Sequence, residues 1–243
     1  MRGRLDQAEI NKIKTKNIMT TKKPIHIAIE GTDCSGKATQ TEKLKQRFIA
    51  EGQPTEVFAF PRYGQPACVL VEKYLHGEYG TAKEVGSYTG SLFYAADRYD
   101  ASFDLRKCLD AGTNVICDRY TSSSMGHQAG NISDLAERDT YLEWLDNLEF
   151  KIFNIPRPDK IVFLYMHPEI SQRLMAQRAD KEYLKGKKKD ILEADVEHLI
   201  RASDAFLYVA KKFGWIVINC APEGELLSID TIHEMVWKGV NAV

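Results

Sequence analysis

The sequence has 243 residues, 44% of them hydrophobic and 28% charged, with a formal net charge of −1. This composition is typical of a globular chain long enough for one sizeable domain. A net charge near zero excludes a general attraction to nucleic acid or anionic membranes, so an anion site must depend on locally placed charge. No apolar run approaches the roughly 20 residues that cross a bilayer, and we expect a soluble protein.

The five cysteines and six histidines are scattered, without the close pairs typical of metal sites. An odd number of cysteines with no pairing pattern suits a reducing compartment, so we expect a cytoplasmic protein. Residues 1–23 are rich in Lys and Arg and lack the apolar core of a secretory signal. We expect a flexible N-terminal extension there; the alternatives are an organelle-targeting signal or a segment that makes electrostatic contacts. We expect one domain over residues 24–243.

Short β-rich segments alternate along this domain with longer segments of helical periodicity. Strands are predicted at residues 25–30, 55–60, 114–118, 160–166 and 215–220. Helices are predicted at residues 37–51, 66–76, 82–111, 133–152, 168–178, 194–213 and 226–239. The alternation predicts an α/β fold with a parallel sheet covered by helices on both faces, and ligands at the carboxyl ends of the strands.

The first strand runs into Gly31–Ala38, GTDCSGKA, which matches the phosphate-binding pattern G-x-x-x-x-G-K and opens a helix. The glycines let the loop curl so that its N–H groups face the phosphates, and Lys37 can reach the β- and γ-phosphates. We expect nucleotide contacts from the whole loop, namely Gly31, Thr32, Asp33, Cys34, Ser35, Gly36, Lys37, Ala38 and Thr39.

Ala38 stands where such loops usually carry the hydroxyl that ligates Mg²⁺. Thr39 is one helical step away, roughly 100° around the axis, so it cannot simply replace that ligand. We expect Mg²⁺ to be held by the nucleotide, water and a carboxylate such as Asp33 or Asp118. Cys34 is interpreted as a small loop residue, with a redox-sensitive thiol as the alternative.

Residues 177–195, QRADKEYLKGKKKDILEAD, are polar and strongly basic. Such a charge run is most often a solvated surface. Because it follows the fourth predicted strand of a phosphate-binding chain, the alternative is a lid that brings cations to the transferring phosphates.

Several ordered motifs resemble those of the thymidylate kinase family, from about Ile25 to Cys220. They are IEGTDCSGKATQ, FAFPRYGQP, FYAADRY and ICDRYTSSSMGHQ, with a similar tail from DILEAD to VINC. The resemblance implies a three-layer P-loop kinase fold with five parallel strands and a basic lid. It also implies transfer of the γ-phosphoryl group of ATP to dTMP with Mg²⁺, and a homodimer.

The resemblance further implies roles for the charged residues of these motifs. Arg119 and Arg62 would bind the acceptor phosphate, and Asp118 would hold Mg²⁺ or its water. Asp33 would contact the sugar 3′-hydroxyl and the metal region. Because Thr32–Ser35 contain no cation, the extra catalytic cation is expected from the lid. The implied catalytic set is Lys37, Asp33, Asp118, Arg119 and Arg178, with Glu193 as a further metal ligand.

The implied base pocket begins with Tyr94 and Arg98, which share one helix face at i, i+4 spacing. The Tyr94 ring would stack on thymine, and Arg98 would donate to a base carbonyl. Phe60 and Tyr63 would wall the pocket, with Tyr63 excluding a ribose 2′-hydroxyl. Further contacts are expected from Ser124, His127 and Gln128. The chain departs from the family pattern here, because Ser124 replaces a common Asn and GHQ replaces AYQ.

Three alternative functions remain at this level. A kinase for another nucleoside monophosphate would differ only in the base pocket. A deoxynucleoside kinase would need a carboxylate base, whereas two arginines indicate an acceptor that already carries phosphate. A nucleotide-binding protein without turnover is supported only by Ala38 and the departures near Ser124.

Overall fold

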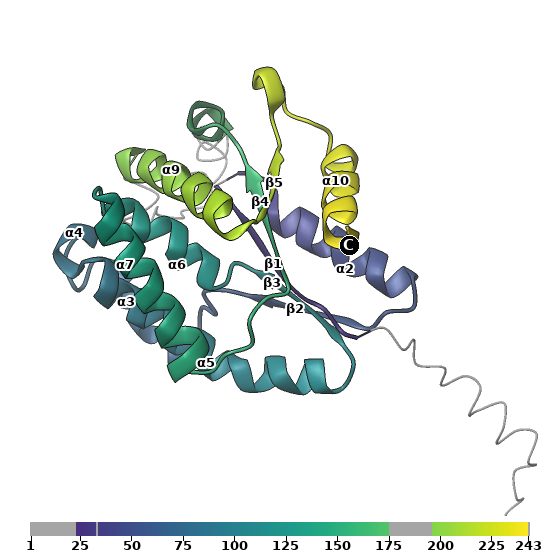
Figure 1. The fold of residues 1–243 in the computed structure, drawn as a ribbon, viewed down its shortest axis with the longest axis horizontal. Helices are drawn as coiled ribbons and strands as arrows, with labels where there is room; N and C mark the ends of the chain where they lie inside the picture. Colours follow the sequence, from purple (N-terminus) through teal and green to yellow (C-terminus); the bar gives the residue numbers. More distant parts are fainter. Residues whose placement is uncertain (1–22, 33, 175–195, 243) are drawn as a thin grey trace, which may run out of the picture.

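The computed structural model of the chain describes residues 23–32, 34–174 and 196–242 (Figure 1). The predicted lid and nearly all of the predicted N-terminal extension lie outside these residues. Within them, no helix is long and apolar enough to cross a membrane.

The core is a sheet of five parallel strands, as predicted, in the order β2-β3-β1-β4-β5. β2 and β3 lie on one side of the central β1, and β4 and β5 lie on the other. β1 is therefore the topological switch point, and sheets of this kind form a ligand-binding crevice there, at the carboxyl ends of the strands. There the register places Ile29 opposite Asp118, and Gly31 opposite Leu164. The strands are β1 (His26–Gly31), β2 (Thr55–Ala59), β3 (Asn114–Asp118), β4 (Lys160–Tyr165) and β5 (Ile216–Asn219).

Helices cover both faces of the sheet because successive strand residues are apolar on both sides (Figure 1). Ile27 and Ile29 pack toward α2 and α10, whereas Ala28 and Phe163 pack toward α5, α6, α7 and α9. The helices are α2 (Lys37–Ala50), α3 (Val69–Leu75), α4 (Ala82–Val85), α5 (Ser87–Asp110), α6 (Thr121–His127), α7 (Leu135–Asp146), α9 (Val196–Phe213) and α10 (Ile229–Asn241). Residues 168–174 are also helical, and Asn147–Ile152 form a π-helix directly after α7.

The structure corrects the sequence-based boundaries in two places. The helix predicted over residues 82–111 is divided at Gly86, whose φ of 76° interrupts helical geometry between α4 and α5. Helix α6 was not predicted, because its sequence TSSSMGH is rich in residues with modest helix propensity. Its formation depends on tertiary contacts described below.

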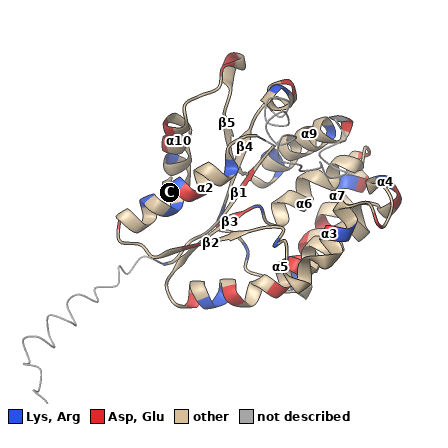
Figure 2. Ribbon diagram, turned by 180° about the vertical axis from the view of Figure 1, so that it is seen from behind, with Lys and Arg blue, Asp and Glu red and all other residues tan. Residues whose placement is uncertain are grey.

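Acidic and basic residues are interspersed along the outer helices, as Figure 2 shows for α5 and α10. Surface pairs such as Lys43–Asp230 and Arg47–Glu234 join α2 to α10 at 2.9 and 2.6 Å. Exposed pairs of this kind contribute about 0–1 kcal/mol each, so the apolar faces of the sheet carry most of the stability.

His26, at the start of β1, links the stability of the fold to pH. Its Nε2 lies 3.3 Å from Cys117 Sγ, and its ring packs edge-on against Tyr120. Burial lowers the His26 pKa from 6.5 to about 4. The folded state therefore binds fewer protons than the unfolded chain between these pH values, so stability present above pH 6.5 is lost as the pH falls toward 4.

We expect this group to remove about 3 kcal/mol of unfolding free energy between pH 6.5 and 4. His26→Phe keeps an aromatic ring against Tyr120. It should make the unfolding free energy less dependent on pH between 6.5 and 4, measured by denaturant titration at a series of pH values. His76→Phe, at an exposed histidine, serves as the control and should not change the slope of unfolding free energy against pH. An equal slope in wild type and His26→Phe would contradict the assignment.

Candidate active site

The loop between β1 and α2 has the geometry of a phosphate-binding loop. A Cβ at Gly31 would lie 2.3 Å from Ser35 Oγ and 2.9 Å from the Leu164 carbonyl oxygen, so only glycine fits there. Gly36 has a φ of 84° and precedes α2, whose first turn has neither a side-chain cap nor an acidic residue. The exposed N–H groups of that turn and the helix dipole favour an anion.

Lys37 points back across this loop. Its Nζ donates to the carbonyl oxygens of Gly31 and Thr32, both at 3.0 Å. Cys34 adopts a left-handed conformation with φ 59°, whereas Ala38 and Thr39 are exposed on the first turn of α2. Asp33 lies outside the described residues, as do Arg178 and Glu193.

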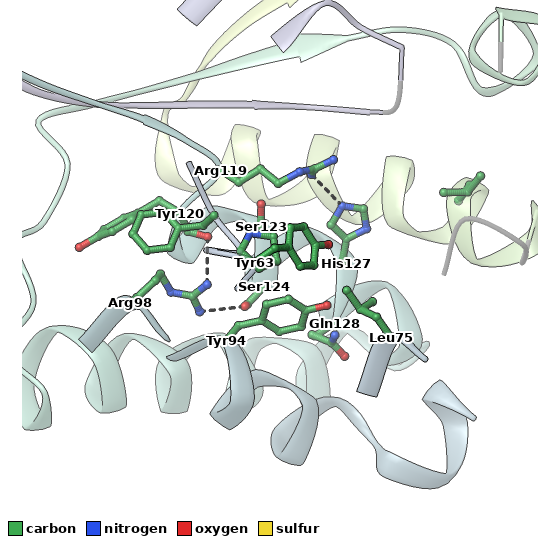
Figure 3. Close-up of a pocket in the computed structure, with 13 residues that line it drawn as sticks. Tyr63, Leu75, Tyr94, Arg98, Arg119, Tyr120, Ser123, Ser124, His127 and Gln128 are labelled. Atoms are coloured by element: carbon green, nitrogen blue, oxygen red, sulfur yellow. Dashed lines mark hydrogen bonds between the residues drawn. The ribbon is translucent and has the colours of Figure 1, made fainter. Parts of the chain in front are cut away.

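A cavity of about 250 Å³ lies beside α5 and the segment that follows β3 (Figure 3). Its lining contains most of the residues predicted for the acceptor: Phe60, Tyr63, Tyr94, Arg98, Arg119, Ser124, His127 and Gln128. Pro61, Leu75, Tyr120, Ser123 and Leu199 complete the lining and were not predicted. The described lining contains no aspartate or glutamate.

One end of the cavity is formed by Arg119 and His127. Arg119 directly follows β3 with a φ of 67°, and its Nη1 lies 3.3 Å from His127 Nε2. The His127 ring stacks on His198 of α9 and packs edge-on against Phe206. His127 therefore contacts both the arginine and the helix that follows residues 175–195.

Arg98 and Gln128 lie at another side of the cavity, beside Tyr94 (Figure 3). Arg98 is buried, and Glu149 accepts from its Nε and Nη2 at 2.7 and 2.6 Å. Burial opposes the charge, but the Glu149 carboxylate raises the pKa of Arg98, which is therefore a cation. Gln128 is also buried, and neither its Oε1 nor its Nε2 has a hydrogen-bond partner among the described residues. Because buried amides are almost always paired, Gln128 indicates a polar ligand.

Glu30, the one acidic residue of β1, organises the segment after β3. Fully buried, it accepts hydrogen bonds from the Tyr120 N–H at 2.9 Å, Ser122 Oγ at 2.7 Å and Ser123 Oγ at 2.8 Å. Burial raises the pKa of Glu30, while Arg119 and these donors oppose the rise. The sequence analysis did not identify Glu30 as a site residue, although an acid inside a strand that is otherwise apolar was the available signal.

Arg62 is held apart from the cavity lining by α5. Its backbone N–H and Nε donate to Asp97 at 2.9 and 2.8 Å, and its Nη2 donates to Asp100 at 2.6 Å. Asp97 is buried, so this contact fixes the loop between β2 and α3. A role for Arg62 at the acceptor phosphate stays a prediction.

A second hollow, of about 550 Å³, lies at the carboxyl ends of β4 and β5. Tyr165, His167, Arg173, Asn219 and Glu223 are among its lining residues. The sequence analysis predicted ligands at the carboxyl ends of the strands in general, without assigning residues after β4 or β5. Both strands leave the same edge of the sheet as the phosphate loop, so the two features share one side of the molecule.

Comparisons with known proteins point to one family. The thymidylate kinase family model matches residues 29–222. The chain is 32% identical over 190 residues to thymidylate kinase of Mycobacterium tuberculosis, covering 78% of this chain and 86% of the relative. It is 26% identical over 203 residues to that of Arabidopsis thaliana, covering 81% and 72%.

The fold also matches a solved structure of thymidylate kinase from Candida albicans, with a TM-score of 0.67 and 20% identity. That match covers 89% of this chain and 90% of the other. The resemblance inferred from the motifs is thereby confirmed, and the chain belongs to the thymidylate kinase family.

Proposed function

We propose that this protein transfers the γ-phosphoryl group of ATP to dTMP, giving dTDP and ADP. The main observation that supports this proposal is a single cavity, with Arg119 at one side and Tyr94, Arg98 and Gln128 at another (Figure 3). An arginine suits a phosphate, and an aromatic ring with two polar side chains suits a pyrimidine.

The base is recognised at the Arg98 end. Tyr94 stacks on the ring, and Arg98 donates to a carbonyl that thymine has and cytosine replaces with an amino group. Gln128 offers a donor and an acceptor, which match the second carbonyl and the N–H of a thymine edge. Phe60 and Tyr63 close the apolar wall, and Ser124 and His127 complete the pocket.

The phosphates meet at the carboxyl edge of the sheet. Lys37 and the N–H groups of the loop bind the ATP phosphates, while the Arg119 guanidinium donates two hydrogen bonds to the phosphate of dTMP. The hollow at β4 and β5 takes the adenine. Since the acceptor oxygen already belongs to a phosphate, no carboxylate base is needed, and alignment with charge neutralisation supplies the catalysis.

Mg²⁺ fits this arrangement. It binds through one or two carboxylates, substrate phosphates and water, and Asp118 stands at the end of β3 beside the strand that leads into the loop. When bound, the ion would neutralise charge on the transferring group. On the family resemblance we assign Asp33 and Glu193 as further ligands and Arg178 as the catalytic cation; these three lie outside the described residues.

The alternatives are weaker on specific grounds. A deoxynucleoside kinase needs a base, and the described lining of the cavity has no carboxylate. A cytidylate kinase would need an acceptor where Arg98 offers a donor, because cytosine carries an amino group in place of that carbonyl. A non-catalytic module would have no use for an acceptor cavity in addition to a phosphate-binding loop.

We also propose that the protein is a cytoplasmic homodimer. None of the five cysteines takes part in a disulfide, as suits a reducing compartment. One stripe of α5 leaves Tyr88, Leu92, Tyr99 and Phe103 between 38% and 52% exposed. Their spacing brings them within about 60° of one another around the helix, which gives a continuous apolar face for a second copy.

The first test is coupled ADP release with ATP and Mg²⁺ against dTMP, dUMP, dCMP, dGMP and thymidine. We expect the highest kcat/KM with dTMP, a lower value with dUMP because it lacks the methyl group, and no turnover of thymidine. If dTMP does not stimulate ADP release, the proposed function is refuted.

Arg119→Ala tests the acceptor phosphate site. Loss of charge-assisted hydrogen bonds worth about 1.5–3 kcal/mol should raise the KM for dTMP by roughly 10- to 100-fold, with the KM for ATP nearly unchanged. Arg157→Ala, at a surface arginine paired with Asp146, is the control and should behave as wild type. Equal losses of ATP and dTMP binding in Arg119→Ala would contradict its assignment.

The dimer is tested by placing a charge in the α5 stripe. Phe103→Glu should convert the dimer to a monomer in analytical ultracentrifugation, because a carboxylate cannot be buried unpaired in an apolar interface. Ile49→Glu makes the same kind of change at an exposed residue of α2 and should leave the dimer intact. A monomeric wild-type protein would refute the proposal.

A further inference from the structure

The hydrogen bonds of Arg98 leave one donor for the cavity. A guanidinium carries five N–H groups in one plane. Glu149 accepts from Nε and Nη2, Ser124 Oγ accepts the second N–H of Nη2 at 3.0 Å, and the Tyr120 carbonyl accepts from Nη1 at 3.4 Å. One N–H of Nη1 therefore has no acceptor among the described residues, and Arg98 lines the cavity.

The direction of this last N–H is set by Glu149. The carboxylate comes from the π-helix Asn147–Ile152 and is completely buried. Its two oxygens bind Arg98 as a fork, and one of them also accepts from Thr121 Oγ1 at 2.8 Å. A bidentate contact fixes the plane of the guanidinium, whereas a single bond would leave it free to rotate.

Glu149 also cancels the charge at the base end. A buried arginine without a partner attracts anions and is costly. Paired with Glu149, Arg98 presents a directed donor with little net charge, which suits an uncharged pyrimidine better than a phosphate. Arg119 at the other side of the cavity is then the preferred position for the phosphate.

We propose that Glu149 is a positioning residue that determines base choice: it holds Arg98 so that its one remaining N–H meets a carbonyl of the base and opposes an amino group. The inference rests on the proposed function, because it takes dTMP as the occupant of the cavity. Glu149 does not line the cavity and acts through Arg98.

The test is the ratio of kcat/KM for dTMP to that for dCMP in Glu149→Gln. The amide can accept only one of the two N–H groups and turns its own donor toward the other, so the guanidinium rotates. A lost hydrogen bond to a charged group corresponds to about 10- to 100-fold. We expect the KM for dTMP to rise by at least tenfold, kcat/KM for dCMP and the KM for ATP to stay within threefold, and the ratio to fall accordingly.

The background Arg98→Met shows whether the effect runs through Arg98. Adding Glu149→Gln to Arg98→Met should not lower the ratio further, because coupled residues are non-additive. Thr121→Val, which removes the other hydrogen bond of Glu149 and keeps both bonds to Arg98, is the matched control and should keep the wild-type ratio. If Glu149→Gln does not fold, Glu149→Asp keeps the charge while displacing the fork and should show a smaller fall.

The outcomes separate the two proposals. A wild-type enzyme that does not favour dTMP over dCMP would refute the proposed base recognition. A selective wild type whose ratio is unchanged in folded Glu149→Gln would overturn this inference alone, as would an equal further fall in the Arg98→Met background. Inhibition by inorganic phosphate that is competitive with dTMP and stronger in Glu149→Gln than in wild type would support the charge-cancelling role.

Discussion

Two buried carboxylates hold the segment on which the acceptor cavity depends. Glu30 reaches it from β1 and Glu149 from the π-helix after α7, and together they accept hydrogen bonds from Tyr120, Thr121, Ser122 and Ser123. This segment starts with Arg119 in a left-handed conformation and continues into α6. Without these acceptors, its backbone and hydroxyl donors would be buried and unpaired, at a cost of about 1–3 kcal/mol each.

The same contacts turn short, polar side chains into a rigid support. Arg119 stands at the start of the segment, while Ser124 and His127 project from α6 and Gln128 follows it. Arg98 ties α5 to this segment through Ser124 and the Tyr120 carbonyl, and Asp97, its neighbour on α5, ties the β2–α3 loop through Arg62. The charged groups around the cavity are thus oriented before a substrate arrives, which lowers the entropic cost of binding.

The departures of this chain from the family pattern have local explanations. Ser124 accepts from Arg98 at 3.0 Å, so a hydroxyl there supports the arginine. His127 packs between Arg119, His198 and Phe206, a position in which an imidazole joins α6 to α9. Gly126 permits this contact, because a Cβ there would lie 2.3 Å from the Phe206 ring.

Sequence alone determined the parallel α/β fold, the phosphate loop and most of the cavity lining, because these depend on local signals: apolar strands, glycines at forced positions and motifs of fixed spacing. The strand order, helix α6 and the roles of Glu30 and Glu149 were decided only by the tertiary structure. Glu149 lies 51 residues from Arg98 in the chain, and Glu30 lies 92 residues from Ser122. Hydrogen bonds over such separations leave no periodic pattern, and a charged residue becomes a buried anchor only when the fold surrounds it with donors.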